Sequence, residues 1–184
     1  YKNTDKPITN FSLLDIGGAD GQFAFIAQGV FKKVVMSDLS KSAVNYAEKV
    51  RMINACSEGF EGRKVQSNVP YDLLTCFHVV EHILNPAIFL EEFKGLMHDN
   101  SYAVISVPVL NWQTKYLMPI HREFGKKRSD LSITTPTEHV NLFTKQSVYS
   151  LAYHCGFDVV FYKERRYKKN AMCEAFFIIR KNKK

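Results

Sequence analysis

The sequence predicts an α/β protein with a doubly wound, Rossmann-like, mostly parallel seven-stranded sheet that ends in an antiparallel hairpin. Short apolar runs alternate with amphipathic segments, which is typical of a parallel sheet covered by helices on both faces. The first apolar run passes through Gly17, Gly18 and Gly21 into an amphipathic segment, as a strand, tight loop and helix do. Two late apolar runs flank a basic bend and predict the hairpin.

Each element is predicted from its local pattern. Strands are expected at residues 13–16, 33–38, 63–67, 71–77, 102–107, 157–162 and 174–180. Helices are expected at residues 20–28, 41 to about 53, 87–97 and 144–155. Ser40, Asn85 and Thr144 stand where N-caps belong, Pro86 suits a first helical turn, and Gly156 suits a helix end.

The composition indicates one domain over residues 1–184. The chain is 46% hydrophobic, which is enough for a core, and no apolar run reaches the ~18 residues of a membrane span. The four cysteines form no C-x-x-C pair. We therefore expect reduced thiols and a cytoplasmic location, and neither disulfides nor a structural zinc site.

The positive charge is concentrated late in the chain. The net charge is +7, and residues 122–184 carry 14 Lys and Arg against 6 Asp and Glu. A basic surface formed by these residues could bind an anionic substrate or nucleic acid, but a run of charged residues is more often only a solvated surface.

A long irregular stretch separates the fifth strand from the last helix. Residues 108–144 contain prolines at 108, 119 and 136, and aromatic residues that include Trp112 and Tyr116. Loops of this length are uncommon unless they are functional. We expect a substrate lid here, with the two aromatic side chains as acceptor walls or as ordinary packing.

The glycine loop indicates a ligand site. Asp15 ends the first strand, and Gly17, Gly18 and Gly21 follow, which does not match the G-x-G-x-x-G dinucleotide motif. Glycines let the backbone approach a ligand closely. An acid at this place would repel a pyrophosphate but suit a cationic ligand, such as a sulfonium or an amino-acid group.

A second acid, Asp38, ends the second predicted strand. In a doubly wound sheet this position lies beside the glycine loop, where a carboxylate can accept hydrogen bonds from ribose hydroxyls. The alternative is an acid that caps the next helix. The spacing favours the ribose role.

Five motifs in this order resemble the class I S-adenosylmethionine-dependent methyltransferases. They are LLDIGGADGQF, SDLS, YDLLTCFHVVEHILNP, AVISVP and EHVNLFTKQSV. Within that family the sequence is most similar to the group of ubiquinone-pathway O-methyltransferases and small-molecule or glycan methyltransferases. The resemblance spans about residues 11–181.

The resemblance implies S-adenosyl-L-methionine as cofactor. The residues that it assigns to the cofactor are Asp15, Gly17, Gly18, Asp20, Gly21, Asp38, Leu39, Asn68, Val69, Phe77 and His78. The loop would face the methionine part, Asp38 the ribose and Leu39 the adenine ring. Asn68 and Val69 would replace an acid that follows the third strand and receives the adenine amino group, and Phe77 and His78 would line the methyl-donor side.

Two histidines are candidate catalytic bases, His82 after the fourth strand and His139 before the last helix. The alternatives are a turn cap for His82 and a loop-ordering role for His139. His78, Glu81 and His82 could also hold a divalent ion, but base or substrate contact is preferred for His82, and no metal site is assigned. The pattern H-x-x-E-H also occurs in zinc peptidases, where both histidines must lie one turn apart on the same helix. Here the segment follows a predicted strand, so this interpretation is disfavoured.

The expected reaction is methyl transfer to a hydroxyl, with an amine as second choice, of a small-molecule or glycan-type acceptor that could be anionic. The alternatives are a cofactor-binding domain without catalysis in a larger assembly, and a nucleic-acid methyltransferase. The first is motivated by Asn68 and by the roughly ten residues before the first strand, where the family usually carries helices that cover the cofactor. The second is disfavoured because no base-methylation motif or RNA-binding module is present. We expect that residues precede Tyr1, that loops are missing from this sequence, or that the site is more open than is usual in the family.

Overall fold

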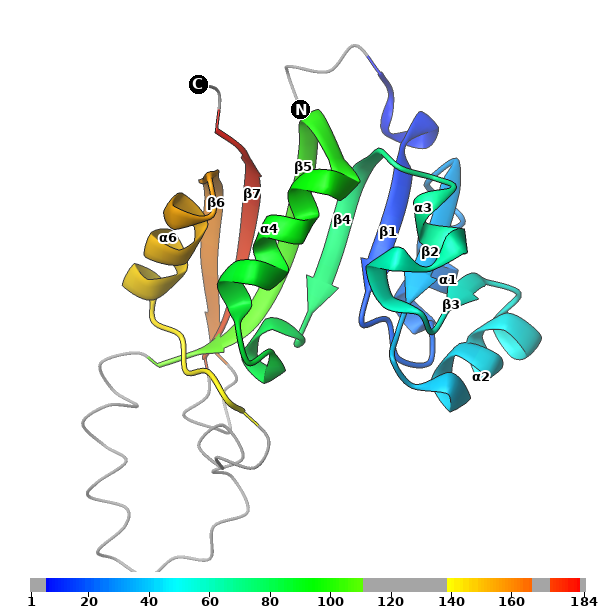
Figure 1. Cartoon of the computed structure of the whole chain (residues 1–184), viewed down its shortest axis with the longest axis horizontal. Coiled ribbons are helices and arrows are strands. Elements are labelled where there is room, and N and C mark those ends of the chain that lie inside the picture. Colours follow the sequence, from blue (N-terminus) through cyan, green and yellow to red (C-terminus); the bar gives the residue numbers. More distant parts are fainter. Residues whose placement is uncertain (1–5, 111–138, 167–172, 183–184) are drawn as a thin grey trace, which may run out of the picture.

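The computed structural model describes residues 6–110, 139–166 and 173–182 (Figure 1). The strands are β1 Ser12–Ile16, β2 Lys33–Ser37, β3 Asn54–Cys56, β4 Tyr71–Phe77, β5 Met97–Val109, β6 Phe157–Arg166 and β7 Cys173–Lys181. The α-helices are α1 Gln22–Ala27, α2 Lys41–Arg51, α3 Arg63–Gln66, α4 Pro86–Leu96 and α6 Lys145–His154. Short 3-10 helices are η1 Ile8–Asn10, η2 Gly59–Glu61 and η3 Val80–His82. No described helix is long and apolar enough to cross a membrane.

The strands form one seven-stranded sheet in the order β3-β2-β1-β4-β5-β7-β6. Strands β1 to β5 pair in parallel, and β7 is antiparallel to both β5 and β6. This confirms the predicted fold class, including the C-terminal hairpin. After β1 the chain turns to β2 on one side, and β4 flanks β1 on the other, which makes the carboxyl end of β1 a topological switch point.

Alternate residues of the inner strands enter two separate cores. Leu14 and Val35 pack in the core beneath α3, α4 and α6, whereas Leu13, Val34 and Met36 pack in the core beneath α1 and α2. Successive side chains of a strand point to opposite faces, so a strand buried on both faces shows a continuous apolar run. This is the pattern from which the strands were predicted.

The predicted helix caps are confirmed. Ser40 Oγ accepts a hydrogen bond from the backbone N–H of Ala43, and Asn85 Oδ1 accepts one from Ile88. Thr144 forms a reciprocal capping box with Ser147. These bonds satisfy backbone donors that a helix start leaves unpaired.

The predicted strand at residues 63–67 is wrong. Arg63–Gln66 is the single helical turn α3, and the third strand is Asn54–Cys56, which pairs in parallel with β2. Helix α2 ends earlier than expected, because Met52 adopts a left-handed backbone with φ of 54° and turns the chain into β3. A three-residue strand is too short for its alternation to be recognised.

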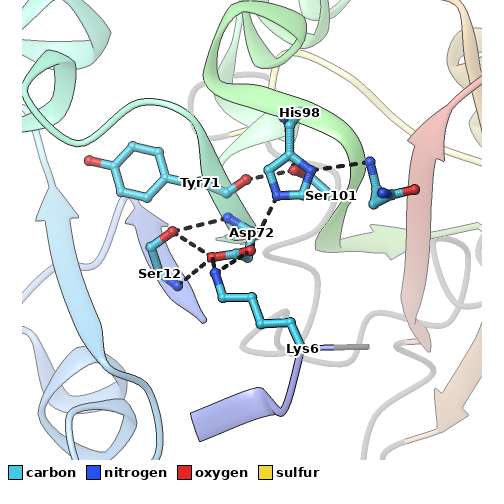
Figure 2. A network of polar contacts seen from close by, with 7 residues as sticks. Lys6, Ser12, Tyr71, Asp72, His98 and Ser101 are labelled. Carbon is cyan, nitrogen blue, oxygen red and sulfur yellow. Dashed lines mark hydrogen bonds and ion pairs between the residues drawn. The ribbon is translucent and has the colours of Figure 1, made fainter. Parts of the chain in front are cut away.

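A hydrogen-bond network around Asp72 fixes the amino end of the sheet (Figure 2). Asp72 is the second residue of β4 and accepts from Lys6 Nζ at 2.7 and 2.8 Å, from Ser12 N at 2.7 Å and from Ser12 Oγ at 2.8 Å. His98 Nε2 lies 3.2 Å from its other oxygen. Burial alone would raise the pKa of Asp72, but Lys6 and Ser12 outweigh it and hold the pKa at about 2. The network ties the N-terminal segment, β1, β4 and β5 together.

Candidate functional site

The glycine loop lies at the carboxyl edge of the sheet, along the lower side of Figure 1. Gly17 and Gly21 have φ of 72° and 78°, a left-handed backbone that L-residues rarely adopt. The N–H of Gly17 donates to Ser37 O at 2.7 Å, which joins the loop to the end of β2. A Cβ on Gly17 would lie 2.2 Å from Val79 Cγ2, so no larger residue fits there. The loop is therefore fixed in place before any ligand arrives.

Asp15 is buried beneath this loop. Its side chain is 2% exposed, and Oδ1 accepts from Thr75 Oγ1 at 2.7 Å, while Oδ2 has no hydrogen-bond partner among the residues that the structure describes. Oδ2 lies 2.7 Å from where a Cβ of Gly18 would stand, so it is directed at the loop. Burial raises the pKa of Asp15 to about 6, although the bond from Thr75 lowers it, and the charge of Asp38 adds a smaller rise. A cation bound at the loop would relieve this cost.

Asp38 connects the loop to the start of α2. Its Oδ2 accepts from the N–H of Ala19 at 2.9 Å, and its Oδ1 accepts from the N–H of Ser40 at 2.8 Å. Each carboxylate oxygen can accept a second bond, so both remain available to a hydroxyl. Leu39, the next residue, is 82% exposed, which leaves an apolar surface beside Asp38.

Asp20 is held from the side of α2. Arg51 Nε donates to the carbonyl of Asp20 at 2.8 Å, and Arg51 Nη2 lies 2.8 Å from Asp20 Oδ2. The arginine lowers the pKa of this exposed carboxyl. Asp20 therefore contributes to the position of the loop through Arg51.

Aromatic rings surround the carboxyl end of β4. Phe77 makes an edge-to-face contact with Phe23 of α1 at a centroid distance of 5.2 Å and a second with Phe176 of β7 at 6.5 Å. Edge-to-face contacts at these distances are favourable for aromatic rings. They make an apolar wall next to the glycine loop.

His78 follows Phe77 in a left-handed conformation with φ of 56°. Its Nε2 lies 2.8 Å from Glu174 Oε1, and its Nδ1 lies 3.3 Å from Glu81 Oε1. The hydrogen bond to Glu81 raises the pKa of His78, burial opposes this, and Glu174 adds to the rise. His78 is thus stabilised as an imidazolium between two buried carboxylates.

The two candidate bases lie together, although 56 residues separate them in the sequence. The rings of His82 and His139 have centroids 4.9 Å apart. Two hydrogen bonds hold the segment after His139 against η3. The N–H of Asn141 donates to Glu81 O at 2.9 Å, and the side-chain amide of Asn141 donates to Ile83 O at 2.5 Å. The backbone bonds thus bring the two histidines to the same edge as Asp15 and Asp38.

Comparison with known proteins assigns the fold to a family. A family model described as "Methyltransferase domain" matches residues 2–161. The chain belongs to this methyltransferase domain family. A search of curated proteins finds no match.

Solved structures agree with this methyltransferase fold. A SAM-dependent methyltransferase from Methanosarcina mazei has a TM-score of 0.71 at 16% identity, covering 96% of this chain and 94% of its own. Magnesium protoporphyrin IX methyltransferase from Synechocystis PCC 6803, with bound S-adenosylhomocysteine, has a TM-score of 0.67 at 14% identity, with coverages of 95% and 76%. The 1,6-didemethyltoxoflavin-N1-methyltransferase from Burkholderia thailandensis gives 0.67 at 13%, with coverages of 95% and 72%.

Asn68 and Val69 are not brought to the site. They follow α3 and precede the amino end of β4, and the Asn68 amide donates to Lys64 O at 2.6 Å. Their assignment rested on the wrong third strand. The residues that do follow β3 are Ser57 and Glu58, on the same edge as Asp38.

Glu58 is an acid two residues after β3, a position that the sequence prediction did not single out. The N–H of Asp38 donates to Cys56 O at 3.1 Å, so the ends of β2 and β3 are joined directly before Glu58. The acid itself is visible in the sequence, but its place beside Asp38 follows only once the third strand is set at Asn54–Cys56. Trp112, Tyr116 and most of the expected lid lie outside the described residues.

Proposed function

We propose that this methyltransferase domain binds S-adenosyl-L-methionine at the carboxyl ends of β1 and β2. We propose further that it transfers the methyl group to a hydroxyl, or as second choice an amine, of a small-molecule or glycan-type acceptor. The observation that carries the proposal is the buried, unpartnered Oδ2 of Asp15 directed at a glycine loop. A carboxylate in that place is costly by itself and becomes favourable with a cation beside it.

The residues present fit the parts of this cofactor. Its ammonium group suits Asp15, and its ribose hydroxyls suit the two oxygens of Asp38, which the loop and α2 already hold in position. The exposed side chain of Leu39 offers a surface for an adenine ring, and Glu58 lies at the next strand end. The rings of Phe23 and Phe77 offer an apolar surface beside the loop.

The chain contributes alignment and a proton acceptor. When bound, the cofactor would supply an electrophilic methyl carbon, to which an acceptor lone pair would bond while the carbon–sulfur electron pair would remain on sulfur. His82 or His139 takes the acceptor proton, a role that typically contributes 10²–10⁴-fold. Rigid placement of the loop before binding favours the in-line geometry, which can be worth about 7–11 kcal/mol.

Calorimetric titration of the full chain with S-adenosylhomocysteine tests the cofactor site. We expect micromolar binding, weakened at least about tenfold by Asp38→Ala, because charge-assisted hydrogen bonds are each worth about 1.5–3 kcal/mol. Since that change also releases the N–H groups of Ala19 and Ser40, Leu39→Ser serves as a second variant that removes no hydrogen bond. The matched control is Asp99→Ala, an exposed acid at the opposite edge of the sheet.

The outcomes separate clearly. Weaker binding in Asp38→Ala and Leu39→Ser with unchanged binding in Asp99→Ala supports the site. Absence of binding by the unmodified chain would overturn it. Binding without turnover across hydroxyl and amine acceptors would leave the cofactor site standing and favour the non-catalytic alternative.

A further inference from the structure

Three side chains from two distant segments converge beside the end of β4. Glu81 and His82 belong to η3, and His139 stands in the segment that Asn141 fastens to η3. One ligand atom from each of these three residues, a carboxylate oxygen and two imidazole nitrogens, lies within 4.8 Å of the other two. This spacing allows all three to contact one small ion.

The buried acid in this cluster has an oxygen that lacks a hydrogen bond. Glu81 is 0% exposed, and Oε2 has no hydrogen-bond partner among the described residues, while Oε1 lies 3.3 Å from His78 Nδ1. A buried polar group without a hydrogen bond destabilises the fold, and more so when it is charged. The residue that carries this cost belongs to the same cluster as two imidazole rings whose centroids are 4.9 Å apart.

We propose that Glu81, His82 and His139 form a binding site for one divalent transition-metal ion. Two imidazoles and one carboxylate are ligands for zinc, iron(II), cobalt or nickel, whereas magnesium and calcium prefer oxygen ligands throughout. His78 stands behind the carboxylate of Glu81 and orients it, as outer partners of metal ligands commonly do.

Three protein ligands leave coordination positions open. Such open sites in other proteins hold water or substrate and make a bound oxygen more acidic. Here η3 begins at Val80, shortly after β4 ends at Phe77, so Glu81 and His82 follow closely on the residue that borders the proposed methyl-transfer position. This last step rests on the proposed function: the metal would bind the acceptor oxygen, and His82 and His139 would act as its ligands instead of as free bases.

Cobalt(II) titration of the tag-free full chain, stripped of metal with EDTA, tests the site. We expect visible d–d absorption of a nitrogen- and oxygen-ligated cobalt ion, saturating at one ion per chain and abolished by competing zinc. His139→Ala, His82→Ala and Glu81→Gln should each weaken binding by at least about tenfold, since even outer partners of ligands are worth 10–100-fold. His154→Ala, an exposed histidine bonded within α6, is the matched control and should bind as the unmodified chain does.

The same titration overturns the proposal in two ways. The proposal is refuted if cobalt fails to bind below millimolar concentration. It is also refuted if cobalt binds His139→Ala and the unmodified chain equally well. S-adenosylhomocysteine affinity, measured on the metal-stripped chain, separates this failure from failure of the proposed function. Cofactor binding without cobalt binding refutes the metal site alone, whereas cobalt binding without cofactor binding refutes the methyltransferase site alone.

Discussion

The substitution Asp15→Asn should raise the free energy of unfolding, increasingly so as the pH rises, and it should weaken binding at the cofactor site. Asparagine keeps a carbonyl oxygen for the bond from Thr75 and removes the charge. The aspartate costs stability in the native state because burial raises its pKa from 3.8 to about 6. The unfolded chain therefore releases its proton at a lower pH than the folded chain does.

The sign and size follow from this shift. Below pH 4 both states hold the proton and the shift has little effect; as the pH rises through 4 to 6, the unfolded state ionises first and native stability falls. A shift of about two units corresponds to about 3 kcal/mol at pH 7. The new amide nitrogen replaces an oxygen that has no hydrogen-bond partner among the described residues, which offsets about 1–3 kcal/mol at every pH.

The decisive quantity is therefore the pH slope of the difference between the two proteins. Urea unfolding at pH 4, 5, 6 and 7 should show the Asp15→Asn variant gaining about 2–3 kcal/mol relative to the unmodified chain between the ends of this range. Asp99→Asn, with its exposed carboxyl, should show no such gain. Parallel profiles for Asp15→Asn and the unmodified chain would refute the buried, raised-pKa description of Asp15. Calorimetry on the same variant should show weaker S-adenosylhomocysteine binding at pH 7.

Three further predictions concern stability. Asp72→Asn should lower the free energy of unfolding by about 1–2 kcal/mol at neutral pH, a value reduced because its partner Lys6 is half-exposed. The native pKa of Asp72 is about 2, so this loss should vanish as the pH falls toward 2. Urea titrations at pH 7 and pH 2 measure the difference. Gly17→Ala should cost at least about 2 kcal/mol and abolish cofactor binding, since its Cβ overlaps Val79; a small loss would show that the loop can shift. Thr144→Ala should cost about 1 kcal/mol by removing the cap of α6, detectable as a lower thermal midpoint.

The inner half of the site could be predicted because its signals are local. Asp15, the glycines and Asp38 each stand directly at the end of a strand whose apolar run is continuous, and the parallel arrangement then brings these ends together. The third strand could not be placed. It pairs with β2 over only three residues, Asn54–Cys56, and its first residue is exposed, so the run is too short to distinguish from the end of α2.

The outer half depends on contacts between distant segments. His82 and His139 were each identified as chemically capable, yet nothing in either local sequence indicates that their rings meet. Their approach depends on two hydrogen bonds from Asn141, one from its backbone N–H to Glu81 O and one from its side-chain amide to Ile83 O, which only the folded chain defines. The same limit applies to Glu81, whose complete burial follows from packing and not from its sequence neighbours.

The buried carboxylates at the two edges of the sheet differ in their hydrogen bonding. At the amino edge, Asp72 receives hydrogen bonds from Lys6 and Ser12, its pKa falls to about 2, and its charge stabilises the fold. At the carboxyl edge, Asp15 on β1 and Glu81 after the neighbouring β4 each keep one buried oxygen without a hydrogen-bond partner among the described residues. The acid at one edge is thus fully bonded, whereas two acids at the other edge each keep an oxygen that no described residue bonds. Both acids lie at the edge where a cationic cofactor group and, as we propose, a metal ion would bind beside these oxygens, which is the arrangement expected of a binding site.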